Sequence, residues 1–193
     1  MQYQRAEAPA RPPVLLGCLG ILAALLVLAI AAGSCVVFLE SGADAGDLVL
    51  DPAELYAPGS VTYLGEDNVF IVRLPDGVFH ALNNLDQPNR ATPGARCRVR
   101  SVSIGDPTIA ARYDAVRESL SPAADGATVI FTEDCNGAIY DLTGILLGAE
   151  GFNLDHHPVS IRDDGRLVVD LSERICTTRT ATQLAATVDC PNP

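Results

Sequence analysis

The sequence has no tryptophan and a single methionine, so capture of a soft metal by thioether side chains has little support. Basic residues are also few: 13 lysine and arginine side chains stand against 24 acidic ones, which gives a net charge of −11. A chain this acidic cannot neutralise nucleic-acid phosphates, and it is poorly suited to an anionic lipid surface. The excess of carboxylates fits simple solubility, and it also fits docking of a basic partner such as a basic redox protein.

Signatures of catalysis are missing as well. No Ser-His-Asp order, glycine-rich phosphate loop or zinc-type cysteine spacing occurs, so an enzyme has little support. No Cys-x-x-Cys pair occurs, which argues against a thiol–disulfide exchanger. His156 and His157 suggest a metal pair, but adjacent residues of a strand point to opposite faces, and His80 reads as a packed strand residue.

One long apolar run occupies residues 14–39 and carries no charge. About 20 apolar residues are enough for a helix to cross a membrane, so the run predicts a single-pass transmembrane helix. Arg5 and Arg11 precede it and acidic residues follow it. The positive-inside rule then keeps residues 1–13 in the cytoplasm and places the main domain on the periplasmic or extracytoplasmic side. Lipid attachment at Cys35, or cleavage followed by secretion, remains an alternative.

The rest of the chain is long enough for one folded domain. Residues 40–55 are small, polar and acidic, and they predict a linker or a short ordered lead-in. Residues 107–120 fit a short amphipathic helix, and the tail at 173–193 is polar. Between them, β-branched runs alternate with turn residues, which predicts strands at 61–64, 69–74, 78–82, 99–104, 127–132, 139–142, 145–147, 159–162 and 167–170. Strands this short indicate an all-β domain, an antiparallel sandwich or barrel.

Six cysteines are present, and two of them, Cys18 and Cys35, lie in the apolar run. The other four lie on the predicted oxidising side of the membrane, at Cys97, Cys135, Cys176 and Cys190. An even number in that location predicts two disulfides. The residues alone leave all three pairings open.

Two segments resemble the two halves of the metal-binding lobe of a Rieske iron–sulfur domain. They read HALNNLDQPN at residues 80–89 and EDCNGAIYDLTG at residues 133–144. Gly137 matches the motif glycine, and Tyr140-Asp141 matches an aromatic–Asp pair. Further matches are the strand pair at 72–82, the strand entry at 154–159 and the final hairpin at 164–169. The resemblance covers residues 56–172 and implies a Rieske-like fold there.

The ligand positions depart from that family. Each Rieske lobe half supplies one Cys and one His to a two-iron, two-sulfur cluster. The corresponding residues here are Asp86 and Pro88 in the first half, and Glu133 and Asn136 in the second. Hard oxygen ligands do not replace thiolates at such a cluster, so we expect no cofactor. Asp86, Glu133 and Asp134 could converge on a hard cation such as calcium, although a solvated acidic rim is the simpler interpretation.

The resemblance also implies a disulfide pairing. Cys135 stands at the variable motif position where Rieske proteins of quinol–cytochrome c oxidoreductases have a disulfide cysteine, and Cys97 is the nearest candidate partner. Cys176 then pairs with Cys190.

These observations predict a non-catalytic, cluster-less Rieske-like subunit that serves as a structural or docking component of a membrane complex, related to electron transfer. Two alternatives stay open: a Rieske-type electron-transfer protein with an unorthodox two-iron, two-sulfur site, and a thiol–disulfide exchange protein. The expected partners are the lipid bilayer, other subunits of the complex and a basic redox protein, and not nucleic acid.

Overall fold

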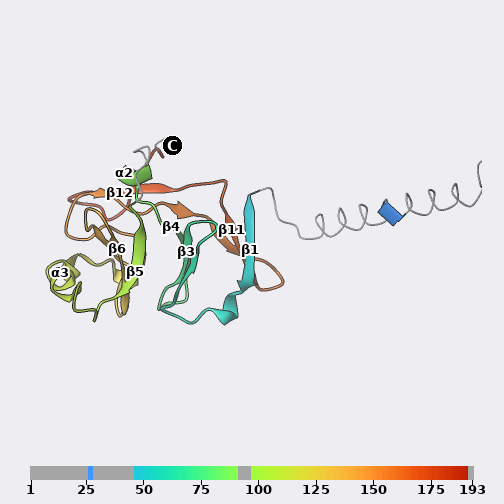
Figure 1. The fold of residues 1–193 in the computed structure, drawn as a ribbon, viewed down its shortest axis with the longest axis horizontal. Helices are drawn as coiled ribbons and strands as arrows, with labels where there is room; N and C mark the ends of the chain where they lie inside the picture. Colours follow the sequence, from blue (N-terminus) through green and yellow to red (C-terminus); the bar gives the residue numbers. More distant parts are fainter. Residues whose placement is uncertain (1–25, 28–45, 91–96, 191–193) are drawn as a thin grey trace, which may run out of the picture. The chain divides into compact units, whose positions relative to one another are not determined.

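The computed structural model describes residues 26–27, 46–90 and 97–190 (Figure 1). The chain divides into two units, Met1–Asp44 and Ala45–Pro193. The predicted transmembrane segment at 14–39 lies outside the described residues, apart from Leu26 and Val27. Within the described ranges, no helix has the length and apolar character needed to span a bilayer.

Short strands dominate the second unit, as the sequence predicts. They are β1 (Asp47–Pro52), β2 (Val61–Leu64), β3 (Val69–Arg73), β4 (Phe79–Asn83), β5 (Val99–Ser103), β6 (Val129–Glu133), β7 (Ile139–Tyr140), β8 (Gly151–Phe152), β9 (His156–His157), β10 (Val159–Ile161), β11 (Arg166–Asp170), β12 (Cys176–Arg179) and β13 (Ala186–Val188). The helical segments are η1 (Ala53–Leu55), α2 (Gln87–Arg90), α3 (Ala110–Asp114), η2 (Arg117–Ser119) and η3 (Pro122–Ala124). The predicted helix at 107–120 is therefore reduced to α3 and the 3-10 turn η2.

The strands form four small sheets, ordered β1-β11-β10, β2-β3-β4-β9, β5-β6-β7 and β13-β12-β8. The β2-β3-β4-β9 sheet is central: β1 and β11 lie on one side of it, and β5 and β6 lie on the other (Figure 1). Alternate residues of β3 point to opposite faces of the central sheet. Val69 and Ile71 pack with Leu167 of β11, while Phe70 packs with Phe131 of β6.

Burial on both faces explains why Val69 to Val72 of β3 are all apolar. Side chains alternate across a strand, so a strand that is covered on both faces needs apolar residues at every position. All residues from Val69 to Val72 are at most 3% exposed. The central sheet thus holds the two outer sheets in place.

The structure adds detail to two predicted segments. The predicted linker or short ordered lead-in at 40–55 contains β1, which pairs antiparallel with β11, followed by η1. Asp47 and Asp51 at the ends of this short apolar run hid the strand, whereas Leu48 and Leu50 between them pack against the core beside β11. The predicted tail at 173–193 is structured over its described part, because β12 pairs with both β13 and β8.

Candidate functional site

The candidate site lies in a lobe, by which we mean the β5-β6-β7 sheet, α3 and the loops at residues 84–90 and 134–138. Strand β5 pairs with β6 over five residues, from Val99 opposite Glu133 to Ser103 opposite Val129. A separate core fills the lobe and is formed by Val102, Ile109, Ile130, Ile139 and Leu147. The loops therefore stand on a packed base.

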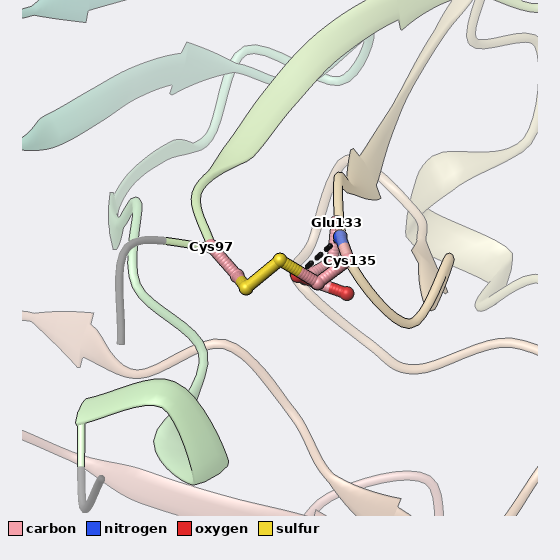
Figure 2. A group of neighbouring side chains, drawn as sticks. All are labelled: Cys97, Glu133 and Cys135. Atoms are coloured by element: carbon pink, nitrogen blue, oxygen red, sulfur yellow. Dashed lines mark hydrogen bonds between the residues drawn. A yellow bond between two sulfur atoms is a disulfide. The ribbon is translucent and has the colours of Figure 1, made fainter. Parts of the chain in front are cut away.

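A disulfide joins Cys97 and Cys135 at the tip of this lobe, with their Cα atoms 5.5 Å apart (Figure 2). The strand register explains it: with Val99 opposite Glu133, the two cysteines stand opposite each other two residues beyond the ladder. The second disulfide joins Cys176 at the start of β12 to Cys190 beyond β13. The structure thus contains both predicted disulfides.

Glu133 lies beside the lobe disulfide and is only 1% exposed (Figure 2). Its carboxylate accepts backbone N–H bonds from Cys135 at 2.7 Å, from Asn136, and from Gly137 at 3.2 Å. Three successive amides around one anion form a nest, a backbone arrangement that favours negative charge. The residue at the expected cluster-cysteine position therefore serves as the acceptor for its own loop.

Asp86, at the other expected cysteine position, is also buried, at 3% exposure. The hydroxyl of Tyr140 donates a hydrogen bond to its Oδ2 across 3.4 Å. Burial, together with the charge of Asp86, raises the pKa of Tyr140, so the phenol stays a donor at all ordinary pH values. This contact ties the first lobe loop to β7.

The carboxylates of the lobe do not converge as a hard-cation site requires. Glu133 turns inward and Asp86 contacts Tyr140, while exposed Asp134 forms an ion pair with Arg100 at 2.8 Å. The expected acidic rim is likewise missing from the described lobe residues, because two of its three carboxylates are buried and the third is paired. Of the remaining ligand positions, Pro88 lies in α2 and Asn136 is exposed at the tip.

The residues of the lobe do not fit a two-iron, two-sulfur cluster. Such a cluster needs free thiolates, and the two sulfurs here are bonded to each other. Pro88 has no side-chain donor atom, and the carboxylate of Glu133 already accepts three amides. Two groups of three candidate ligands occur in the described residues, Cys97–Glu133–Cys135 and Asp155–Cys176–Cys190, and each depends on both sulfurs of a disulfide.

Comparison with known proteins gives little further information. No family model matches the sequence, and no curated protein matches it. Among solved structures, the chain is similar to one described as an NADH-dependent nitrite reductase small subunit from Mycobacterium tuberculosis. The identity is 19% and the TM-score 0.33, over 70% of this chain and 96% of that chain. A likeness this weak decides neither the fold family nor the function.

A groove of about 480 Å³ opens beside the lobe tip. Its walls are mostly apolar, with Val116, Ile139 and Leu147 among them. The exposed Arg112 lies at the groove, and its guanidinium donates a hydrogen bond to the Gly137 carbonyl. The groove therefore borders the same loop that Glu133 organises.

Sequence reasoning missed one pair of side chains on the central sheet. His157 turns into the protein, where its Nδ1 lies 2.8 Å from the Glu173 carbonyl oxygen. His156 instead faces His80, and their Nδ1 atoms are 3.3 Å apart. Strand β9 pairs with β4 so that Leu82 lies opposite His156, which makes His80 a diagonal neighbour on the same face. Only the strand register reveals this pair, because the two residues are far apart in sequence.

Both histidines of this pair are held neutral near pH 7. Burial lowers the pKa of His80, although Asp141 and Asp76 act in the opposite direction. Burial, and then the neighbouring His80, lowers the pKa of His156 to about 4. The pair therefore presents neutral imidazoles rather than cations.

Proposed function

We propose that this chain is a non-catalytic, cluster-less Rieske-like subunit that acts through its surface, as a docking or structural component of a membrane complex. The layered β architecture of the second unit and the Cys97–Cys135 disulfide support the proposal. The observation that carries it is the placement of Glu133. Its buried carboxylate accepts the amides of Cys135, Asn136 and Gly137, in the loop where the resemblance locates cluster ligands.

The physical argument concerns the amides of that loop. Backbone N–H groups need an acceptor, and a hydrogen bond to a charged acceptor contributes about 1.5 to 3 kcal/mol to stability. Glu133 supplies the acceptor, and the disulfide supplies the cross-link between the two lobe segments. The lobe thereby has a fixed shape that depends on no inorganic group, which is what a docking surface requires.

The groove beside the tip is the contact surface that we propose for another subunit of the complex. Its apolar walls can receive an apolar side chain, and Arg112 adds a charge next to it. A basic redox protein would meet a different region, because exposed Glu54 and Asp164 line a pocket at η1 and the β10–β11 turn. Residues 14–39 supply the proposed membrane anchor.

Iron and acid-labile sulfide assays on the full-length chain, purified anaerobically in mild detergent, test the absence of a cluster. We expect neither element in stoichiometric amount and no Rieske-type visible or paramagnetic-resonance spectrum. A spectrum of that type, with two irons per chain, would establish the electron-transfer alternative and refute the proposal.

Site-specific photo-crosslinking in native membranes tests the docking surface. Ala149 lines the groove and is exposed, whereas Ala57 is exposed near the start of β2, outside the groove. A photoreactive residue at position 149 should capture a protein that also co-purifies with the unmodified chain, and the same residue at position 57 should not. Equal capture at both positions, or none at position 149, contradicts the proposed surface.

A further inference from the structure

His80 and His156 form a side-chain pair that the proposed function does not use. Their Nδ1 atoms are 3.3 Å apart, their ring centres are 5.2 Å apart, and the rings are inclined at 75°. His80 lies on β4 and His156 on β9, two neighbouring strands of the central sheet. Sheet pairing, rather than a flexible loop, sets the distance between the two rings.

These distances fit two ligands of one tetrahedral metal ion. With zinc–nitrogen bonds of about 2.0 to 2.1 Å and a tetrahedral angle, two ligand nitrogens lie about 3.3 Å apart and the centres of two imidazole rings about 5.2 Å apart. The pair matches both values. A square-planar ion would need its neighbouring nitrogens nearer to about 2.9 Å, so the pair suits zinc better than copper(II) or nickel(II).

A further contact orients His156 for such a role. Its ring donates a hydrogen bond to the backbone carbonyl of Thr143. Because Nδ1 faces His80, the donor is Nε2, which lies toward the turn at Gly144. A neutral imidazole that donates from Nε2 keeps a lone pair on Nδ1. Metal-binding histidines use this same arrangement, in which a carbonyl on the far nitrogen fixes tautomer and ring orientation.

The charges around the pair favour a cation. The carboxylates of Asp141 and Asp76 both act on His80. Asp141 is no ligand, because it accepts hydrogen bonds from Ser121, Thr143 and Ile145. The two carboxylates therefore contribute negative potential at the pair.

We propose that His80 and His156 form a two-imidazole binding site for a divalent metal ion of the zinc type, with water as the remaining ligands. The site lies on the central sheet and uses no lobe residue, so it is independent of the proposed docking function. All three histidines of the chain are described, and the third, His157, is engaged elsewhere through Nδ1.

Zinc titration of the full-length chain tests this site. The protein is washed with EDTA, kept oxidised so that both disulfides stay closed, and titrated with zinc chloride in a calorimeter. We expect one specific site, and we expect His80→Gln and His156→Gln each to weaken zinc binding about tenfold or more. Glu66→Gln, which removes an exposed carboxylate on the β2–β3 turn, should leave zinc binding unchanged.

Nitrogen NMR of the histidine rings supplies a second readout, which needs no variant to fold. Zinc should shift the Nδ1 resonances of His80 and His156 and leave those of His157 in place. Zinc binding of equal strength in both His→Gln variants, shifts confined to His157, or no binding by the wild type would overturn the proposal. In the last case the pair is only an imidazole–imidazole hydrogen bond.

Discussion

Glu133 and Asp134 are neighbours in sequence with opposite environments. Glu133 is 1% exposed and accepts three backbone amides, whereas Asp134 is exposed and pairs with Arg100. A buried charge that satisfies several donors contributes far more to stability than a solvated ion pair does. Alanine substitutions at Glu133 and Asp134 can therefore be compared directly for their effect on stability.

Glu133→Ala should lower the free energy of unfolding by about 2 to 4 kcal/mol, because three loop amides lose their acceptor. Asp134→Ala should cost less than about 1 kcal/mol, since it removes only an exposed pair. Urea denaturation of both variants, followed by circular dichroism, measures the difference. Equal losses at the two positions would contradict the role assigned to Glu133.

His156 makes the stability of the metal-free protein depend on pH. Its pKa is about 4 in the folded protein and about 6.5 in the unfolded chain, so between these values the unfolded chain binds more protons. Stability is therefore complete above about pH 6.5 and falls as the pH drops toward 4.

We expect the wild type to lose about 1 to 2 kcal/mol between pH 7.5 and 5 through this group. His156→Gln should remove that part of the loss. Urea unfolding of both proteins at the two pH values, in EDTA, gives the difference directly. A greater loss in the variant than in the wild type would show that the sign is wrong.

At the scale of elements, the turn at Gly144 lies against Leu82 of β4 and against Leu154. Its φ of +80° suits glycine, and an added Cβ would lie 3.1 Å from Leu82 and 3.2 Å from Leu154. Gly165, in the β10–β11 turn, has almost the same φ, +81°, but no atom within 4 Å of such a Cβ. The two glycines thus share backbone conformation and differ in surroundings.

Gly144→Ala should cost about 3 kcal/mol or more, since left-handed strain and crowding act together. Gly165→Ala should cost about 1 to 2 kcal/mol, from the strain alone. Thermal unfolding of the two variants separates these contributions. If they proved equally destabilised, the packing around Gly144 would not be tight.

The lobe disulfide closes a longer loop than the tail disulfide, with sequence separations of 38 and 14. In the chain-entropy model, losing Cys97–Cys135 costs about 4 kcal/mol and losing Cys176–Cys190 about 3 kcal/mol. Cys135→Ser should therefore lower stability, as measured by chemical denaturation. A variant that folds as well as the wild type but loses a thiol-exchange activity would support the exchange alternative instead.

The strands that combine an apolar run with turn residues were predictable, whereas β1, the strands of the predicted tail and two of the two-residue strands were not. Strands β3, β4, β5, β6 and β11 combine apolar runs with turn residues such as Asp76-Gly77, which a sequence displays directly. The two-residue strands β8 and β9 have no such local pattern, because distant partners fix them. The same limit hid the His80–His156 pair, since it depends on the register of β4 against β9.

The lobe shows a related limit on site prediction. The disulfide and the four substituted ligand positions follow from the resemblance, but the direction of each side chain does not. From sequence alone, an acidic residue at the end of a strand is expected to be solvated. Glu133 is buried instead, because the backbone amides that follow it turn back toward its carboxylate. The prediction of a solvated acidic rim was wrong at Glu133 for this reason.

For the molecule as a whole, the net charge of −11 favours a basic partner. The arginines around the lobe are partly offset by carboxylates, since Arg100 pairs with Asp134, while exposed Glu54 and Asp164 line a pocket at η1 and the β10–β11 turn. We propose that a basic partner meets this pocket and that another subunit of the complex meets the groove beside the lobe. Attachment to a membrane would further restrict which region each partner can reach.

Membrane attachment through residues 14–39 is the prediction on which this arrangement depends. An apolar helix of that length should resist extraction by alkaline carbonate, and a C-terminal alkaline phosphatase fusion should be active, because the positive-inside rule places the domain outside. Cys35→Ser should change neither result if the helix is the anchor. Release of that variant into the soluble fraction would identify lipid attachment at Cys35 instead. Release of the unmodified chain would indicate cleavage and secretion.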